Sequence, residues 1–329
     1  MCRLAWERDP RVRARTQTSV AITADGNQWI ILNAAPDLKS QLDRTPALHP
    51  RGGLRSSPVK AVVLTGGEVD QIAGLLTLRE REPFALCATA ETLDLIEANP
   101  IFGVLAPALV SRIAVLPGVA FGLPGGIEAE MFTVPGKAPL YVEGDAPEIG
   151  GESAVSVGIE TRAGKCRLAF VPGAAAITPM LHARLSRADV VLFDGTLFTD
   201  DEMIRKETGT KTGRRMGHLP IDRADGSLAS LAGIPGRRIY IHINNTNPVL
   251  VDGSPERRRV EAAGWEIAED GMEIVLCICS PPTSSKRSCA TSARAAIIAC
   301  IRSIACCTAA SAARARSRPG RSIAIITRR

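Results

Sequence analysis

Three runs of apolar residues, each as long as a buried strand, lead to side chains that can bind a metal ion. The runs are residues 61–64, 190–193 and 239–243, and the side chains are Asp70, Asp194 and His242. The carboxyl ends of buried strands meet at one edge of a sheet, so we expect the three side chains to gather there. A mixed Asp and His set suits zinc or non-haem iron.

Each of these residues also has an ordinary structural interpretation. A histidine between Ile241 and Ile243 is commonly a hydrogen-bonded part of the core. Asp70 and Asp194 match aspartates that cap helices or form turns. The coincidence of three strand ends, rather than any one residue, favours a site.

Strand and helix patterns alternate over residues 1–276, which indicates an α/β layered domain. We expect a hairpin around residues 25–27, and a loop or flap over the Gly- and Pro-rich residues 118–151. The predicted strands cover residues 19–23, 29–33, 61–64, 85–88, 155–160, 167–171, 190–193 and 239–243. The predicted helices cover residues 36–41, 69–78, 90–98, 179–186 and 256–263.

Charge and motifs exclude several classes of function. The net charge is +6, but ten of the 40 Lys and Arg lie in residues 277–329, which contain no Asp or Glu. The remaining body is mildly acidic, so no nucleic-acid partner is expected. There is no P-loop, dinucleotide fingerprint or Gly-x-Ser-x-Gly elbow, and no apolar run long enough for a membrane span. Without a signal-peptide core, the expected location is the cytoplasm.

Residues 277–329 differ in composition from the rest of the chain. They hold six of the nine cysteines and are rich in Arg, Ser and Ala. We interpret them as a separate basic tail, either disordered or translated out of frame, and assign them no function.

Several sequence blocks within residues 2–276 together identify a family. They are residues 15–19 (Arg-Thr-Gln-Thr-Ser), 193–197 (Phe-Asp-Gly-Thr-Leu), 209–218, ending in His218, and 241–248 (Ile-His-Ile-Asn-Asn-Thr-Asn-Pro). This set resembles the pyrroloquinoline quinone (PQQ) biosynthesis protein B family of the metallo-β-lactamase superfamily. The resemblance implies a four-layer αββα sandwich with a metal pocket at one edge of the paired sheets.

The resemblance also shows which metal ligands this chain has lost. The superfamily motif His-x-His-x-Asp-His falls on Gly66, Glu68, Asp70 and Gln71, so only the aspartate is retained. A further ligand position falls at Pro172-Gly173, where no side chain can bind a metal. The hydrolytic two-metal site is therefore expected to be absent.

The retained residues predict a mononuclear metal site. The ligands implied by the resemblance are Asp70, Asp194, His218 and His242. Two carboxylates and two imidazoles suit Fe(II), with zinc as the alternative. His218, which follows Met216-Gly217, equally fits an ordinary loop histidine.

Four further positions complete the prediction. Gln71 replaces a family histidine beside Asp70, and we count it with Asp70, Asp194 and His242 as a catalytic position. An amide is a weaker ligand than imidazole and cannot act as a base. Asn244, Asn245 and Arg214 are predicted to orient an acidic substrate.

The family begins with a strand and a Cys-x-Cys-x-x-Cys zinc cluster, of which Cys2 would be the last cysteine. We therefore expect a sandwich that lacks its first strand, has lost the structural zinc and has low stability.

The resemblance implies metal- and oxygen-dependent hydroxylation of the tyrosine ring in a precursor of PQQ derived from Glu and Tyr. The expected partners are this precursor, O2 and other PQQ biosynthesis proteins. Two alternatives stay open: a non-catalytic carrier in the transport of PQQ or its precursor to the periplasm, and a decayed, inactive copy.

Overall fold

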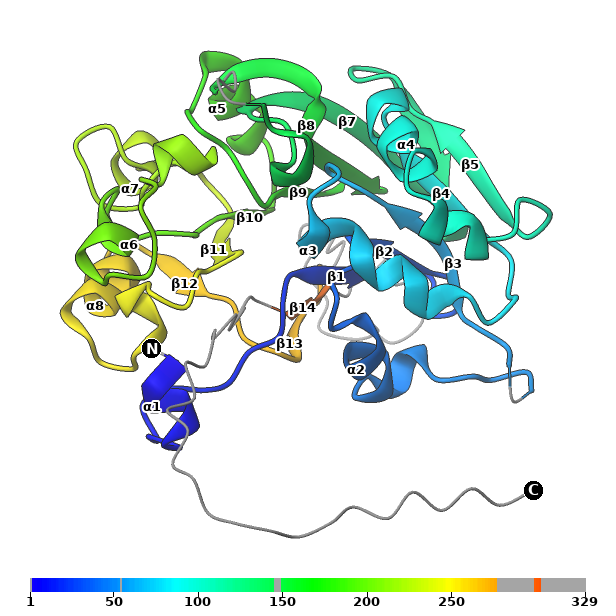
Figure 1. The fold of residues 1–329 in the computed structure, drawn as a ribbon, viewed down its shortest axis with the longest axis horizontal. Coiled ribbons are helices and arrows are strands. Elements are labelled where there is room, and N and C mark those ends of the chain that lie inside the picture. The colour runs from blue at the N-terminus through cyan, green and yellow to red at the C-terminus, as the bar shows by residue number, and fades with distance from the viewer. Residues whose placement is uncertain (1, 54, 145–148, 277–298, 303–329) are drawn as a thin grey trace, which may run out of the picture.

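The computed structural model describes residues 2–53, 55–144, 149–276 and 299–302. Within these ranges, two seven-stranded sheets pack face to face (Figure 1). The first sheet has the spatial order β13 (Met272–Ile274), β14 (Ala299–Arg302), β1 (Ser19–Ile22), β2 (Trp29–Leu32), β3 (Val59–Val63), β4 (Phe84–Ala88) and β5 (Val110–Ala114). The second has the order β12 (Trp265–Ile267), β11 (Arg237–Ile241), β10 (Val190–Asp194), β9 (Cys166–Val171), β8 (Gly151–Ala163), β7 (Ile127–Gly136) and β6 (Ala120–Leu123).

Short helices cover the outer faces of both sheets. The α-helices are α1 (Cys2–Trp6), α2 (Leu38–Asp43), α3 (Val69–Ile72), α4 (Ala90–Glu97), α5 (Pro179–Leu185), α6 (Glu202–Arg205), α7 (Ser227–Ser230) and α8 (Pro255–Ala262). The 3-10 helices are η1 (Pro46–Leu48), η2 (Ala73–Leu78), η3 (Pro100–Val104), η4 (Pro124–Gly126), η5 (Leu140–Val142), η6 (Arg214–Met216) and η7 (Pro248–Leu250). Among the described residues, no helix combines the length and the apolar composition needed to cross a bilayer.

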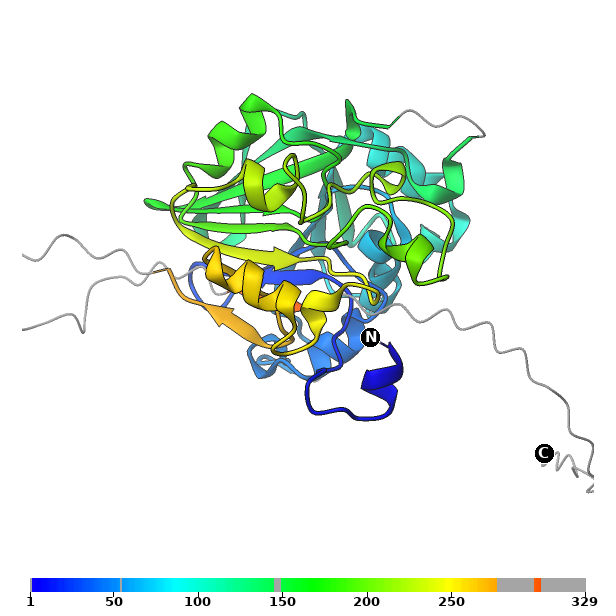
Figure 2. The same cartoon turned by 90° about the vertical axis from the view of Figure 1, so that its left-hand side faces the viewer.

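Three buried clusters hold the four layers together. One lies between the sheets, where residues such as Ile30 of β2 and Met131 of β7 share a single cluster. A second joins α2, α3 and α4 to the outer face of the first sheet. The third joins α5 and α8 to the outer face of the second sheet. The expected αββα sandwich is thus confirmed, and Figure 2 shows its layers from α5 above to α2 below.

Strand direction explains where polar residues gather. Strands β2 to β5 run parallel to one another, as do β9 to β12. Parallel strands place their carboxyl ends at the same edge of a sheet, and polar loops follow there. Asp70 follows β3, Asp194 ends β10 and His242 follows β11. The fold therefore places the three predicted strand-end residues at one edge.

The structure corrects the predicted secondary structure in residues 118–151. The Gly- and Pro-rich segment contains β6 and the ten-residue strand β7, so it is not a continuous loop. Residues along β7 alternate, with Ile127, Ala129 and Met131 buried and Glu128 exposed. This alternation is typical of a strand and outweighs the flanking glycines. The predicted strands also missed β5, β12 and β13, and the predicted helices missed α1, α6 and α7.

The predicted tail needs a second correction. Residues 299–302 form β14, which pairs antiparallel with both β1 and β13. This strand lies between β1 and β13, and β13 forms the edge of the sheet. The rest of residues 277–329, for which we expect disorder or an out-of-frame origin, lies outside the described residues.

Candidate metal centre

Two strand ends that surround the site have a strained backbone. His242 follows β11 with φ 53°, and Asn33 follows β2 with φ 57°. Residues other than glycine rarely adopt this left-handed conformation, and it concentrates at functional sites. The Asn33 carboxamide accepts a bond from the Thr65 backbone N–H at 2.8 Å and donates to the Thr65 hydroxyl at 2.8 Å. These contacts fix the loop that leads to Asp70.

Asp194 is the buried centre of the site, with no solvent-exposed surface. Its Oδ2 accepts a bond from the Ala174 backbone N–H at 3.2 Å and lies 2.8 Å from His218 Nδ1. Its Oδ1 accepts bonds from the backbone and the hydroxyl of Thr196. Burying an unpaired carboxylate would be very unfavourable, so these partners are needed to keep Asp194 charged.

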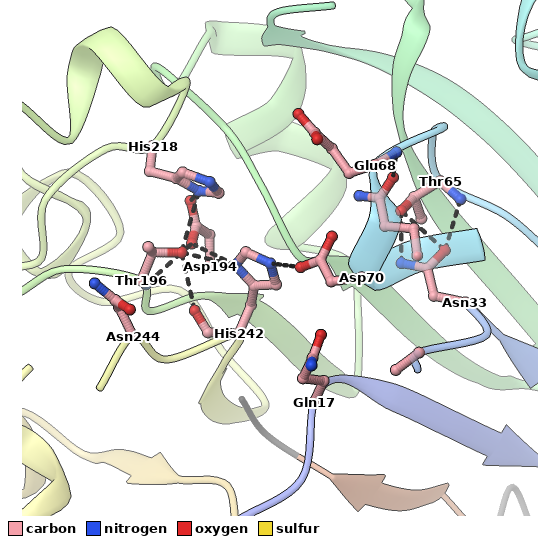
Figure 3. Close-up of polar contacts among 12 residues, drawn as sticks. Gln17, Asn33, Thr65, Glu68, Asp70, Asp194, Thr196, His218, His242 and Asn244 are labelled. Carbon is pink, nitrogen blue, oxygen red and sulfur yellow. Dashed lines mark hydrogen bonds and ion pairs between the residues drawn. The ribbon is translucent and has the colours of Figure 1, made fainter. Parts of the chain in front are cut away.

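The Thr196 hydroxyl joins the ligands to one another (Figure 3). Its oxygen lies 2.6 Å from Asp194 Oδ1, 2.7 Å from His242 Nδ1 and 3.1 Å from His218 Nδ1. A hydroxyl has one proton, and the shortest contact assigns it to Asp194. The hydroxyl oxygen then accepts a bond from the Nδ1–H of His242, which leaves His242 Nε2 as the free ligand atom in the neutral ring.

The free nitrogen of His242 faces Asp70 across the gap between the two sheets. His242 Nε2 and Asp70 Oδ2 are 2.8 Å apart (Figure 3). Two bare acceptors at this distance would repel each other, so the pair requires either a proton or a metal cation between them. This contact joins a residue from the first sheet to one from the second.

The pKa shifts at the site are consistent with a proton or a cation between His242 and Asp70. Burial alone would lower the pKa of His242, but the hydrogen bond with Asp70 and the charges of Asp70, Asp194 and Glu68 raise it above its ordinary 6.5. Burial would likewise raise the pKa of Asp70 and Asp194, yet interactions with His242 and His218 hold both below 3.8. Without a metal, the site thus favours a protonated His242 between charged carboxylates.

The residues present fit a metal ion. One ligand atom each from Asp194, His218 and His242 lie within 4.8 Å of one another. The rings of His218 and His242 are stacked, with centroids 5.1 Å apart. Asp70 adds a carboxylate whose side chain is 26% exposed, and so it faces the open side of the group. The structure therefore brings together all four predicted ligands.

Glycine positions explain why a second metal pocket is lacking among the described residues. A Cβ atom at Gly66 would lie 2.7 Å from Gln71 Oε1 and 2.9 Å from the Val155 carbonyl oxygen. A Cβ atom at Gly173 would lie 3.4 Å from Cε1 of His218. Gln71 and the Val155 carbonyl thus fill the space beside Gly66, one of two positions from which the superfamily's ligand side chains would extend, whereas the contact at Gly173 is an ordinary van der Waals distance.

Gln71 has a structural contact that its predicted catalytic role did not anticipate. Its side-chain oxygen accepts a bond from the Glu68 backbone N–H at 3.2 Å, which caps the first turn of α3. Its backbone carbonyl accepts a bond from the Ala34 N–H at 2.7 Å. Gln71 therefore holds the loop that positions Asp70.

The predicted substrate-binding residues have contacts within their own loops. The Asn244 amide donates to the Thr246 hydroxyl, and the Arg214 guanidinium pairs with Asp225 at the surface. Asn245 is buried beside them, with its backbone N–H bonded to the Asn244 side chain. Their role in substrate binding stays a prediction.

Sequence reasoning missed Thr196 and Glu202 as parts of the site. Glu202 is buried, accepts bonds from the Thr246 hydroxyl at 2.5 Å and the Phe198 N–H at 2.8 Å, and so ties the loop after β11 to the loop after β10. Its only sequence signal is an acidic residue in a short helix, α6. Thr196 follows a predicted ligand by two residues, which would have been the available clue.

Comparisons with known proteins agree with this geometry. The family model for the beta-lactamase superfamily domain matches residues 28–243. A coenzyme PQQ synthesis protein B from Methylobacterium sp. (strain 4-46) is 53% identical over 276 residues, which cover 84% of this chain and 92% of the relative. The relative of the same name from Gluconacetobacter diazotrophicus is 48% identical and covers 83% and 92%.

Solved structures indicate the same family and the same fold. The crystal structure of Zn(2+)-bound PqqB from Methylobacterium extorquens is 50% identical, with a TM-score of 0.81, and the match covers 82% of this chain and 91% of that one. A diphosphatase of the PhnP family shares only the fold, with 19% identity, a TM-score of 0.55 and coverage of 80% and 85%. The chain belongs to the coenzyme PQQ synthesis protein B family, within the beta-lactamase superfamily.

Proposed function

We propose that this protein acts in the synthesis of coenzyme PQQ by hydroxylating the tyrosine ring of a precursor derived from Glu and Tyr. Membership of the coenzyme PQQ synthesis protein B family supports the pathway. The proposed reaction is metal- and oxygen-dependent, with Fe(II) as the metal.

The contact between Asp70 and His242 carries the proposal. A carboxylate and an imidazole nitrogen 2.8 Å apart, beside Asp194 and His218, form a set of two oxygen and two nitrogen donors. Such a set suits Fe(II) with coordination positions left for other ligands. A bound Fe(II) would activate O2, and each hydroxylation would take two further electrons and two protons from an external reductant, with the second oxygen atom released as water. Hydrolysis through a metal pair is disfavoured, because Gly66 and Gly173 provide no ligand side chain at two positions of the superfamily's metal site.

The surrounding residues prepare this set for the metal. A bound metal would take the place of the proton between His242 Nε2 and Asp70 Oδ2, while Thr196 would keep the other ring nitrogen, Nδ1, protonated. The Ala174 N–H and the Thr196 hydroxyl hold both oxygens of Asp194 in place. Preorganised ligands of this kind keep a coordination geometry without moving the strands.

Anaerobic loading with Fe(II), followed by exposure to O2, a reductant such as ascorbate and the cross-linked Glu-Tyr precursor, tests the proposal. We expect one bound iron per chain and a product that has gained one oxygen atom, measured by metal analysis and mass spectrometry. Asp194→Ala should lose both, and the zinc-loaded chain should bind the precursor without turnover. The control Asp94→Ala, at an exposed position on α4, should retain both.

The outcomes separate the proposal from its alternatives. Precursor binding without metal, together with undiminished PQQ production by the Asp194→Ala variant in cells, would point to a carrier and contradict the proposal. The absence of both precursor binding and metal uptake would indicate a decayed, inactive copy.

A further inference from the structure

A second charged cluster lies beside the metal centre. Three cations, Lys137, Lys211 and Arg215, surround the carboxylate of Glu143. Lys211 Nζ is 3.4 Å and Lys137 Nζ 3.9 Å from Glu143 Oε2, and Arg215 donates to Glu143 Oε1. The Glu143 side chain is only 4% exposed, although it lies in a loop.

The cluster is in contact with two of the loops that carry metal ligands, those of Asp70 and His218. The ammonium group of Lys137 is 2.9 Å from Glu68 Oε1, and Glu68 lies two residues before Asp70. The aliphatic part of Lys137 lies against Gly217, where a Cβ atom would be 3.2 Å from Lys137 Cγ. Gly217 immediately precedes His218. A ligand that contacts these cations would therefore lie next to the metal centre.

Polar contacts, rather than apolar packing, hold Glu143 in position. We call residues 137–144 the flap. Three of its apolar side chains, Leu140, Tyr141 and Val142, are 43–61% exposed. The flap is attached to the loop after β3 by the Tyr141 hydroxyl, which donates to the Gly67 carbonyl at 2.8 Å, and by the Leu140 N–H, which donates to Glu68. An anion that competes for the cations can therefore release Glu143 without exposing a core.

The cluster around Glu143 contains more positive than negative charges, so it needs an anion at the position of the Glu143 carboxylate. Lys137, Lys211 and Arg215 carry three positive charges, and Glu68 and Glu143 carry two negative charges. Removing Glu143 would leave three cations, of which Lys137 is mostly buried, with one carboxylate among them, which favours the entry of another anion. The Arg215 guanidinium is suited to bind a carboxylate with two parallel hydrogen bonds.

We propose that Lys137, Lys211 and Arg215 form a carboxylate-binding subsite for the substrate, and that Glu143 fills it from within the chain when no substrate is bound. The identity of the ligand as a Glu-derived carboxylate rests on the proposed function. The subsite itself follows from the ion pairs of the flap and from the position of Lys137 between the two ligand loops.

Binding of glutarate to the metal-free, full-length chain tests the subsite, with uncharged glutaramide as the control ligand. Glu143→Gln should bind glutarate about tenfold more tightly, because a site that is closed most of the time loses apparent affinity in proportion. Glu130→Gln, which removes another carboxylate paired with an arginine, Arg184, should leave the affinity unchanged. Arg215→Gln and Lys211→Gln should each weaken binding about tenfold.

Hydrogen exchange tests the release of Glu143 in the chain without any substitution. Glutarate should speed the exchange of the amides of residues 138–144, whereas chloride at the same ionic strength should not. Unchanged affinity in Glu143→Gln, or exchange unaffected by saturating glutarate, would overturn the proposal. Neither measurement involves turnover, so a failure of hydroxylation leaves this inference intact and a failure here leaves the metal chemistry intact.

Discussion

At the scale of single residues, the Thr196 hydroxyl sets the protonation of the ligands. It donates to Asp194 and accepts from His242, and so it selects the ring nitrogen of His242 that faces Asp70. Residues that orient metal ligands typically contribute roughly 10- to 100-fold in metal affinity.

Thr196→Val should therefore weaken metal binding by about 10- to 100-fold, since valine keeps the shape and removes only the hydroxyl. Titration against a chelator of known affinity measures the change. Thr161→Val is the matched control, because the Thr161 hydroxyl is buried and has no hydrogen-bond partner among the described residues. Equal metal affinity in both variants would contradict this role of Thr196.

The protonation of His242 should also make metal binding depend on pH. The ion displaces a proton from His242, whose pKa is raised above 6.5. Affinity should therefore fall by about tenfold per pH unit as the pH drops below that raised value. His49→Gln, at an exposed histidine outside the site, should keep the same pH profile. A flat profile between pH 6 and 8 would be inconsistent with a proton at Asp70 and His242.

Without metal, the pair of Asp70 and His242 also makes the stability of the chain depend on pH. A rise in pH that strengthens metal binding weakens the contribution of His242 to stability. The contribution of His242 is complete below pH 6.5 and is lost as the pH rises through its raised pKa. The contribution of Asp70 is complete above pH 3.8 and is lost as the pH falls through its lowered pKa. The metal-free chain should therefore gain most from this pair between these two values, as urea unfolding over the pH range can measure.

At the scale of whole elements, sequence patterns were most reliable for buried parallel strands. Strands β3, β10 and β11 each contain a short apolar run, and the ends of these runs located Asp70, Asp194 and His242. The strand β7 was missed because Gly and Pro flank it, although its alternating residues carry the signal. Thr196 and the flap cations could not be found in this way, because their roles depend on loops that meet only in the folded chain.

The strand β14 makes the expectation of low stability testable. It lies between β1 and β13 and pairs with both. Ile301→Pro removes a backbone donor from the middle of a sheet, so it should destabilise the chain by on the order of 3 kcal/mol. Ile301→Val retains that donor and should have little effect. Thermal unfolding distinguishes them, and equal midpoints would mean that β14 contributes nothing to the stability of the sheet.

At the scale of the molecule, the metal centre joins the two sheets. Asp70 comes from the first sheet, whereas Asp194 and His242 come from the second. A metal ion held by all three would cross-link the two halves of the sandwich. The family and the fold were predictable from the sequence, because blocks such as residues 193–197 and 241–248 are specific to the family.

This cross-link predicts stabilisation by metal. At a metal concentration 100-fold above the dissociation constant, binding should stabilise the chain by about 2.7 kcal/mol, which would raise the thermal midpoint by roughly 4 to 5 °C. Asp70→Ala should lose much of this gain, while the exposed Asp94→Ala should retain it. A metal-induced shift of the same size in both variants would show that the ion does not join the sheets.

The placement of His218 has a consequence for how the ion is exchanged. Asp194 and His242 belong to rigid strand ends, but His218 follows a left-handed Gly217 in a loop and its side chain is 18% exposed. One of the donors can thus rotate outward while the others stay in place. Loading and release should proceed through this loop, at a rate set by a local hinge rather than by unfolding of the sandwich.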